Sequence, residues 1–346
     1  MTVVDWILAE RIARYVAGTG DGRLPSADLT ELAAESERRV VAYTSLEPAA
    51  PLPPPEGIGR EEWVRSNIGA MRQLLDPVLA RAGKGLGPLR PAAQIGVGLV
   101  LSMEVGVVVG YLAQRVLGQY ELVLLDEAVA ERPPRLLFVL PNLGQAVNAF
   151  GAEEREFMTW VALHEVTHAV QFAGVPWLHG HVAGLVRELL QTAEVRMESP
   201  RRLRLPSGEE LRRTLSALRR GDLIAIVTSP AERETLDKVQ AVMAVIEGHA
   251  EHVMDAVAPD LLPSLPKLRA ALNRRRRSQS GLSRLVARLL GLDLKLRQYE
   301  QGKRFCDAVV SEGGPEALGH VFSSPEALPT LEELEHPSRW LQRTAV

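Results

Sequence analysis

Cysteine is nearly absent from this chain: Cys306 is the only one among 346 residues. A single cysteine excludes an intrachain disulfide, and it also excludes a metal site built from several thiolates. Aromatic residues are few as well, at 5%, whereas hydrophobic residues as a whole make up 46% of the chain. These values are typical of a globular protein that buries a core of aliphatic side chains.

A strong excess of charge of either sign is also lacking, since the formal net charge is −3 at pH 7. Such a balance gives no general attraction to nucleic acid or to anionic lipid. Basic residues do gather at Arg201–Arg220 and at Arg274–Arg277, which would suit a nucleic-acid site. Runs of this kind are usually solvated faces, so we expect no nucleic-acid binding.

One stretch, Ile95–Leu112, is hydrophobic enough to be considered as a membrane span, although Ser102 and Glu104 interrupt it. Small residues recur there at every fourth position, from Gly98 to Gly110, and such a stripe lets another helix approach closely. The carboxylate in the middle and the glycines favour a central core helix over a membrane span. We therefore expect no association with a membrane.

The first 15 residues do not resemble a signal peptide, because Asp5 and Glu10 interrupt their apolar pattern and no basic segment precedes it. This pattern predicts a cytoplasmic location.

The stretch 152–173 contains neither proline nor glycine, and its apolar residues recur at helical spacing, which predicts a buried helix that ends at Gly174. Within it, His164, Glu165 and His168 form the pattern H-E-x-x-H. Residues four apart lie on one face of a helix, so both imidazoles can bind one cation at about 2 Å. Glu165 lies about 100° further round, where it is better placed to take a proton from an activated water than to bind metal. We therefore predict a zinc site with Glu165 as the general base.

A catalytic zinc keeps three protein ligands and one open position, so another segment must supply the third ligand. The third histidine that some zinc peptidases carry six residues after the second is absent, because Gly174 occupies that position. Our candidate is Glu247, in a helix predicted over 229–258. The neighbouring Gly248 would be explained by close contact with the active-site helix. Glu251, one turn further, is expected to orient a ligating histidine through a hydrogen bond.

Other histidines are rivals for the metal. His252 has the better ligand type for zinc, but it lies about 140° from Glu247 around the helix. His179 and His181 form an H-x-H pair whose members point to opposed faces of a helix, so we expect neither to bind metal.

The chain resembles a known group in three segments, which are WVALHEVTHAVQFAGVPWL (160–178), EGHAEHVMD (247–255) and GLDLKLRQYEQGKRFCDAV (291–309). The group is the zincin-like metallopeptidase family of actinobacteria and related lineages, sometimes labelled as associated with deazaflavin coenzyme biosynthesis. The resemblance covers nearly the whole chain and implies a zinc hydrolase. More distantly, Glu247 and the residues after it are similar to the third-ligand segment of glutamate-type zinc aminopeptidases. In those enzymes about twenty residues separate the second histidine from the glutamate, whereas 79 positions separate His168 from Glu247 here.

In the last of these segments, Tyr299 is a candidate to stabilise the oxyanion of a tetrahedral intermediate. A solvated basic helix face is the alternative, because Lys295, Arg297 and Lys303 lie nearby.

The predicted fold class is mainly α (α+β), a helical zincin-like metallopeptidase with a small sheet beside the active-site helix. Strands are expected at 120–125 and 135–140, and a Pro-rich connector at 51–55. Residues 1–118 should form a helical region packed on a catalytic part, 119–346, that carries a helical insertion at about 176–228. We expect one compact unit.

Two functions are compatible with these patterns. The first is a zinc peptidase that acts on a peptide or a small amide, with His164, His168 and Glu247 as ligands. The second is a non-catalytic scaffold that retains zinc for stability. An open metal position favours the enzyme, whereas a fourth protein ligand favours the scaffold.

Overall fold

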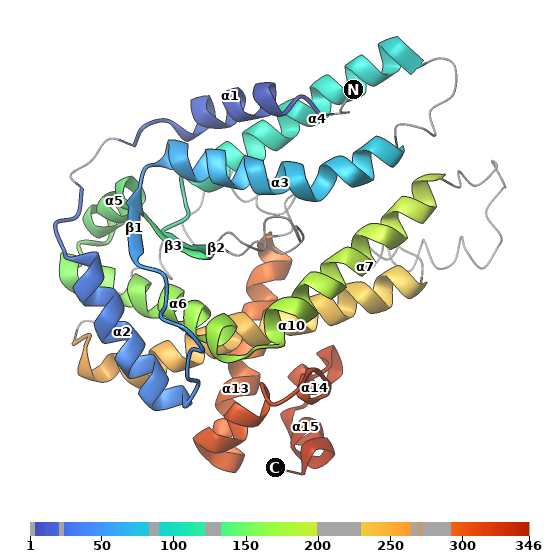
Figure 1. Cartoon of the computed structure of the whole chain (residues 1–346). Coiled ribbons are helices and arrows are strands. Elements are labelled where there is room, and N and C mark those ends of the chain that lie inside the picture. Colours follow the sequence, from blue (N-terminus) through green and yellow to red (C-terminus); the bar gives the residue numbers. More distant parts are fainter. Residues whose placement is uncertain are drawn as a thin grey trace.

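A small sheet lies between two groups of helices in the computed structural model of the chain (Figure 1). The structure describes residues 4–20, 24–82, 90–121, 133–198, 230–263, 270 and 292–345. The main described elements, in chain order, are α1 (Trp6–Ala17), α2 (Leu29–Thr44), β1 (Pro55–Ile58), α3 (Arg60–Ala82), α4 (Arg90–Ala113), β2 (Gly118–Glu121), β3 (Arg135–Val139), α5 (Leu140–Phe150), α6 (Glu154–Gly174), α7 (Leu178–Glu198), α10 (Pro230–Val257), α13 (Leu292–His320), α14 (Leu331–Glu335) and α15 (Pro337–Thr344). The predicted class, mainly helical with a small sheet, is confirmed.

Within the described residues the sheet has three strands in the order β1-β3-β2. Strand β1 runs parallel to β3, and β2 runs antiparallel to it. The side chains of β3 alternate between two cores, because successive residues of a strand point to opposite faces. Leu136 and Phe138 pack with α2, α6 and α10. Leu137 and Val139 pack with α1, α3 and α4, so the sheet is covered on both faces.

The active-site helix α6 lies at the centre of the first of these cores. Its N-terminus is capped by the carboxylate of Glu153, which accepts a hydrogen bond from the backbone N–H of Glu156. The helix contacts β2 and β3 on one side, and α2 and α10 on others. This packing buries most of the side chains between Phe157 and Gln171. A third core joins α7, α10 and α13 to α14 and α15.

Helix α4 packs against α1 through its stripe of small residues. The hydroxyl of Ser102 accepts a hydrogen bond of 2.8 Å from the backbone N–H of Asp5. A methyl group added at Gly106 would lie 2.7 Å from the carbonyl oxygen of Ala9. The expected close approach is therefore confirmed, with α1 as the partner.

The expectation that α4 is a central core helix is wrong, because several of its large apolar side chains are exposed to solvent. Leu99, Val100, Met103 and Val107 are each about half exposed. No helix in the part of the chain that the structure describes is long and apolar enough to cross a membrane.

Two elements of the structure were not predicted from the sequence. Strand β1 begins at Pro55, the last residue of the Pro-rich stretch that we interpreted as a connector, and helix α5 begins at Leu140, where we expected a strand to end. The strand expected at 120–125 begins earlier, at Gly118, and its residues 122–125 lie outside the described residues. Strands of four or five residues carry little periodicity, which explains the errors in β1 and β2. Helix α5 has eleven residues, but Pro141 and Gly144 lie in its first half and weaken the helical pattern.

Candidate metal centre

Helix α6 carries the two histidines on one face. His164 and His168 are one helical turn apart, and their Nε2 atoms lie 3.2 Å from each other. Their rings are nearly perpendicular, at 85°. Two imidazole nitrogens so close together point to one position in space, as the H-E-x-x-H spacing predicted.

Helix α10 brings Glu247 to the same position. Its Oε2 atom lies 3.7 Å from Nε2 of His164 and 3.6 Å from Nε2 of His168. In a tetrahedral zinc site, ligand atoms about 2.1 Å from the metal lie about 3.4 Å from one another. The three residues therefore fit a zinc ion without any rearrangement of the helices.

The three ligand side chains are not fully buried. The side chains of His164, His168 and Glu247 are 25%, 12% and 17% exposed. Within the described residues, no fourth histidine, cysteine or carboxylate joins the group. Three protein ligands with an accessible position are typical of a catalytic zinc, whereas a structural zinc has four.

The charges of the group also suit a cation. Burial and the neighbouring His168 lower the pKa of His164 to about 4, so that this ring is neutral. Burial opposes the charged form of His168, but the hydrogen bond to Glu247 and its negative charge raise the pKa of His168 to about 9. Without a metal, a proton therefore lies between His168 and Glu247. A bound cation takes the place of that proton.

A side chain that the sequence did not single out fixes the orientation of His168. The side-chain amide of Gln171 donates from Nε2 to the carbonyl of Ile246 and to Nδ1 of His249, both at 2.9 Å. Burial lowers the pKa of His249 to about 3, so its neutral ring can accept this bond. The oxygen of Gln171 therefore faces Nδ1 of His168, 2.9 Å away, and accepts its proton. This leaves the lone pair of Nε2 for the metal.

The spacing contained a signal for this residue. Gln171 follows His168 by three positions, which places both on one face of the helix. The spacing does not predict the orientation of the Gln171 amide. That orientation depends on the carbonyl of Ile246, which lies on another helix.

Glu165 lies against strand β2 and next to the two histidines. It is 7% exposed, and the backbone N–H of Tyr120 donates a hydrogen bond to its carboxylate. Burial raises the pKa of Glu165 to about 7, against the effects of His168 and of this bond, and with the help of the negative charge of Glu247. A carboxylate with a pKa near 7 can accept a proton and release it again at neutral pH.

The rival ligand His252 is occupied elsewhere. Its Nε2 atom lies 2.8 Å from the hydroxyl of Tyr43, and its Nδ1 atom lies 2.7 Å from the carboxylate of Asp307. It takes no part in the group of His164, His168 and Glu247.

Three other residues were considered for the site on the basis of the sequence. Glu251 is partly buried on α10, one turn beyond Glu247, and its expected bond to a ligating histidine stays a prediction; the partner of His168 is Gln171. The side chain of Tyr299 lies outside the described residues. His181, on α7, packs edge-on against Trp177, the residue before that helix, and takes no part in the metal group.

The explanation that we expected for Gly248 is wrong. A methyl group at this position would overlap the backbone of Gly302 on α13, and one at Gly302 would overlap the carbonyl of Ala244. The glycine therefore permits close contact with α13, and not with the active-site helix. It still serves the site, because this crossing fixes α10 next to Glu247.

Comparison with known proteins agrees with this geometry. A search of curated proteins finds no match. A solved structure from Chloroflexus aurantiacus, described as a "putative hydrolase with a novel fold", is similar in fold, with a TM-score of 0.71. It is 29% identical in sequence, and the similarity covers 99% of each chain. The family model for zincin-like metallopeptidases matches residues 4–341. Since the match spans nearly the whole chain, this protein belongs to the zincin-like metallopeptidase family.

Proposed function

We propose that the protein is a zinc-dependent hydrolase that cleaves an amide bond in a peptide or a small amide. His164, His168 and Glu247 hold the zinc, and Glu165 is the general base. The observation that carries the proposal is the convergence of three ligand atoms at tetrahedral spacing beside a buried carboxylate with a pKa of about 7. Membership of the family and the hydrolase description of the similar structure support it.

When bound, zinc supplies a Lewis acid that polarises the substrate carbonyl and lowers the pKa of a water molecule. Glu165 accepts the proton that the attacking water loses, and it then delivers this proton to the nitrogen of the leaving amine. Gln171 holds His168 in the tautomer that leaves Nε2 free of a proton. A role of Tyr299 in stabilising the oxyanion remains part of the proposal.

Strand β2 is the element best placed to orient a substrate. It lies beside α6 and, within the described residues, at the edge of the sheet. An edge strand pairs readily with an extended peptide through backbone hydrogen bonds. We propose that a peptide substrate lies along this strand.

The experiment begins with the metal content of purified protein, compared with that of His164→Ala and Glu165→Gln. Zinc should be bound at one ion per chain by the wild type and by Glu165→Gln, whereas His164→Ala should lose it. A peptide-library digest should then show cleavage by the wild type and a loss of about a thousandfold or more in Glu165→Gln, because proton transfer is lost. Undiminished cleavage by Glu165→Gln would remove Glu165 from the mechanism.

The zinc-stabilised scaffold gives a different result in the same experiment. It predicts zinc in the wild type but no cleavage of any peptide or amide. The set of three ligands, with no fourth among the described residues and with side chains that are partly exposed, favours the enzyme.

A further inference from the structure

Strand β2 presents its two faces to two different helices. Gly118 and Tyr120 face α6: Gly118 lies against Glu165, and the ring of Tyr120 stacks on Phe172 with centroids 6.2 Å apart. Gln119 and Glu121 bond to α3. This division follows from the two-residue period of a strand.

The backbone of β2 forms the wall behind Glu165. A methyl group at Gly118 would lie 2.5 Å from Cγ and 2.8 Å from Oε1 of Glu165. Real Cβ atoms do not approach other atoms so closely. The backbone N–H of Tyr120 also donates to the carboxylate. The position of the carboxylate therefore depends directly on the position of this strand.

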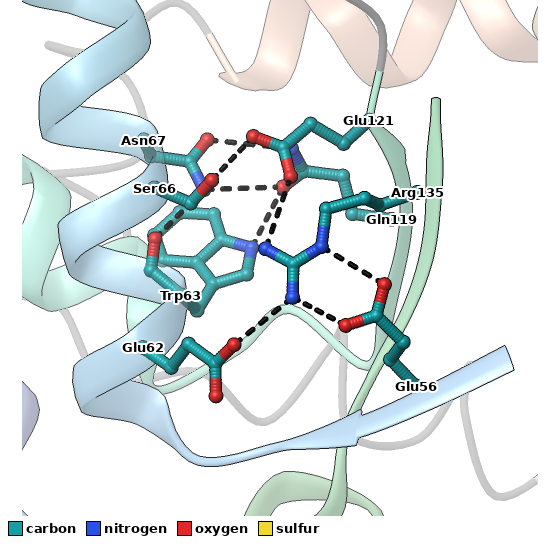
Figure 2. A network of polar contacts seen from close by, with 8 residues as sticks. All are labelled: Glu56, Glu62, Trp63, Ser66, Asn67, Gln119, Glu121 and Arg135. Carbon is teal, nitrogen blue, oxygen red and sulfur yellow. Dashed lines mark hydrogen bonds and ion pairs between the residues drawn. The ribbon is translucent and has the colours of Figure 1, made fainter. Parts of the chain in front are cut away.

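A polar network joins β2 to α3 (Figure 2). The indole N–H of Trp63 donates to the side-chain oxygen of Gln119 at 2.7 Å, and the hydroxyl of Ser66 donates to Glu121. Trp63 is only 4% exposed, so its N–H has no ready replacement partner in water. Asn67 is a further, longer contact of Gln119, at 3.4 Å.

The same network extends across the sheet. The guanidinium of Arg135, on the central strand, donates to Glu56 on β1 at 2.9 Å and to Glu62 on α3 at 2.9 Å. It also lies 3.8 Å from the carboxylate of Glu121. The guanidinium of Arg135 therefore connects β3 to both edge strands and to α3.

Strand β2 needs such contacts because, within the described residues, it has four residues and pairs with β3 on one side. Short edge strands have few ladder hydrogen bonds, and a shift of one residue would turn every side chain to the opposite face. After such a shift, the side chain of Gln119 would occupy the position at which Gly118 now leaves room for the side chain of Glu165.

We propose that the contacts of Gln119 and Glu121 with α3 fix the position of β2, and that they thereby aim the carboxylate of Glu165. Gly118, Gln119 and Glu121 are positioning residues in this mechanism, and α3 is a required part of the catalytic apparatus. The inference rests on the proposed role of Glu165 as general base.

The first test measures the contact between Gly118 and Glu165 and does not depend on enzyme activity. It is a double-mutant cycle in which thermal unfolding is measured. Gly118→Ala should lower the Tm by several degrees, because the new methyl group meets Glu165. The loss should be smaller in a Glu165→Ala background, which lacks the atoms that the methyl group would meet. The control is Gly69→Ala on the exposed face of α3, where the added methyl group has nothing within 4 Å; its Tm should not fall, because alanine is the better helix former. An equal loss in both backgrounds, or no loss, would overturn the proposed contact.

The second test compares Gln119→Leu with Gln119→Glu. The glutamate keeps an acceptor for the indole N–H of Trp63, whereas the leucine does not. Gln119→Leu should retain zinc and increase the hydrogen exchange of the β2 amides, and Gln119→Glu should restore their protection.

Turnover of a peptide found in the library digest provides the functional readout. Gln119→Leu should lower kcat by on the order of a hundredfold with little change in KM, because a misplacement of about 1 Å costs this much. An unchanged kcat with exposed β2 amides would refute the positioning role. If the wild type cleaves nothing, the proposed function fails, while the unfolding cycle and the exchange data still decide whether α3 and β2 hold Glu165.

Discussion

At the scale of residues, the metal centre depends on which nitrogen of His168 carries a proton. Gln171 determines this, because its oxygen accepts from Nδ1 and its nitrogen is bonded to Ile246 and His249. We predict that Gln171→Leu lowers zinc affinity by about 10- to 100-fold, as loss of such partners typically does. A competition titration with a chromophoric chelator measures it. Thr167→Val is the matched control, because among the described residues the hydroxyl of Thr167 bonds to its own helix, at the carbonyl of Leu163. Equal losses in both variants would contradict the role of Gln171.

Zinc binding should also depend on pH. The pKa of His168 is raised to about 9, above the ordinary value of 6.5, so this residue binds its proton at neutral pH in the metal-free protein. Zinc must displace that proton. Affinity should therefore increase about tenfold per pH unit from about pH 7 to 9 and level off above it. Calorimetry in buffers of different ionisation enthalpy should show release of one proton per zinc at pH 7.5. Release of none would contradict the proposed proton between His168 and Glu247.

At the scale of elements, the crossing of α10 and α13 fixes the third ligand. Gly248 and Gly302 meet backbone to backbone, one residue from Glu247. We predict that Gly248→Ala lowers the free energy of unfolding by about 1–3 kcal/mol, as overpacking does, and that it weakens zinc binding by moving α10.

The control for this prediction is Gly180→Ala. Gly180 is exposed on α7, and a methyl group there meets nothing within 4 Å. This variant should gain up to about 1 kcal/mol, because alanine is the better helix former. Chemical denaturation measures both variants, and a neutral Gly248→Ala would show that the two helices can separate without loss.

At the scale of the whole molecule, the candidate metal ligands come from two helices that are far apart in the chain. His164 and Glu247 are 83 positions apart, and α6 and α10 contact each other around them. Zinc that binds only the folded state stabilises it by mass action, by about 4 kcal/mol at a free concentration a thousandfold above Kd.

Removal of zinc with a chelator should therefore lower the Tm by several degrees, and added zinc should restore it. Glu247→Ala provides the control, since a protein without the third ligand should respond weakly to either treatment. Differential scanning calorimetry measures the shift. A chelator effect of the same size in Glu247→Ala would show that the metal lies elsewhere.

Much of this protein could be predicted from the sequence. Periodicity over twenty residues gave α6, and the spacing of His164, Glu165 and His168 placed their side chains on it, because both depend only on the geometry of one helix. The mainly helical class was predicted for the same reason. Membership of the family followed from motifs in three segments, and the match over residues 4–341 confirms it.

Only the tertiary structure decided how distant segments meet. It brought Glu247 to the histidines, and it engaged His252 with Tyr43 and Asp307 instead. It assigned Gly248 to a contact with α13, and it placed Gly118 behind Glu165. A local pattern fixes the direction of a side chain on its own helix, but the identity of its neighbour depends on the packing of elements that are remote in sequence.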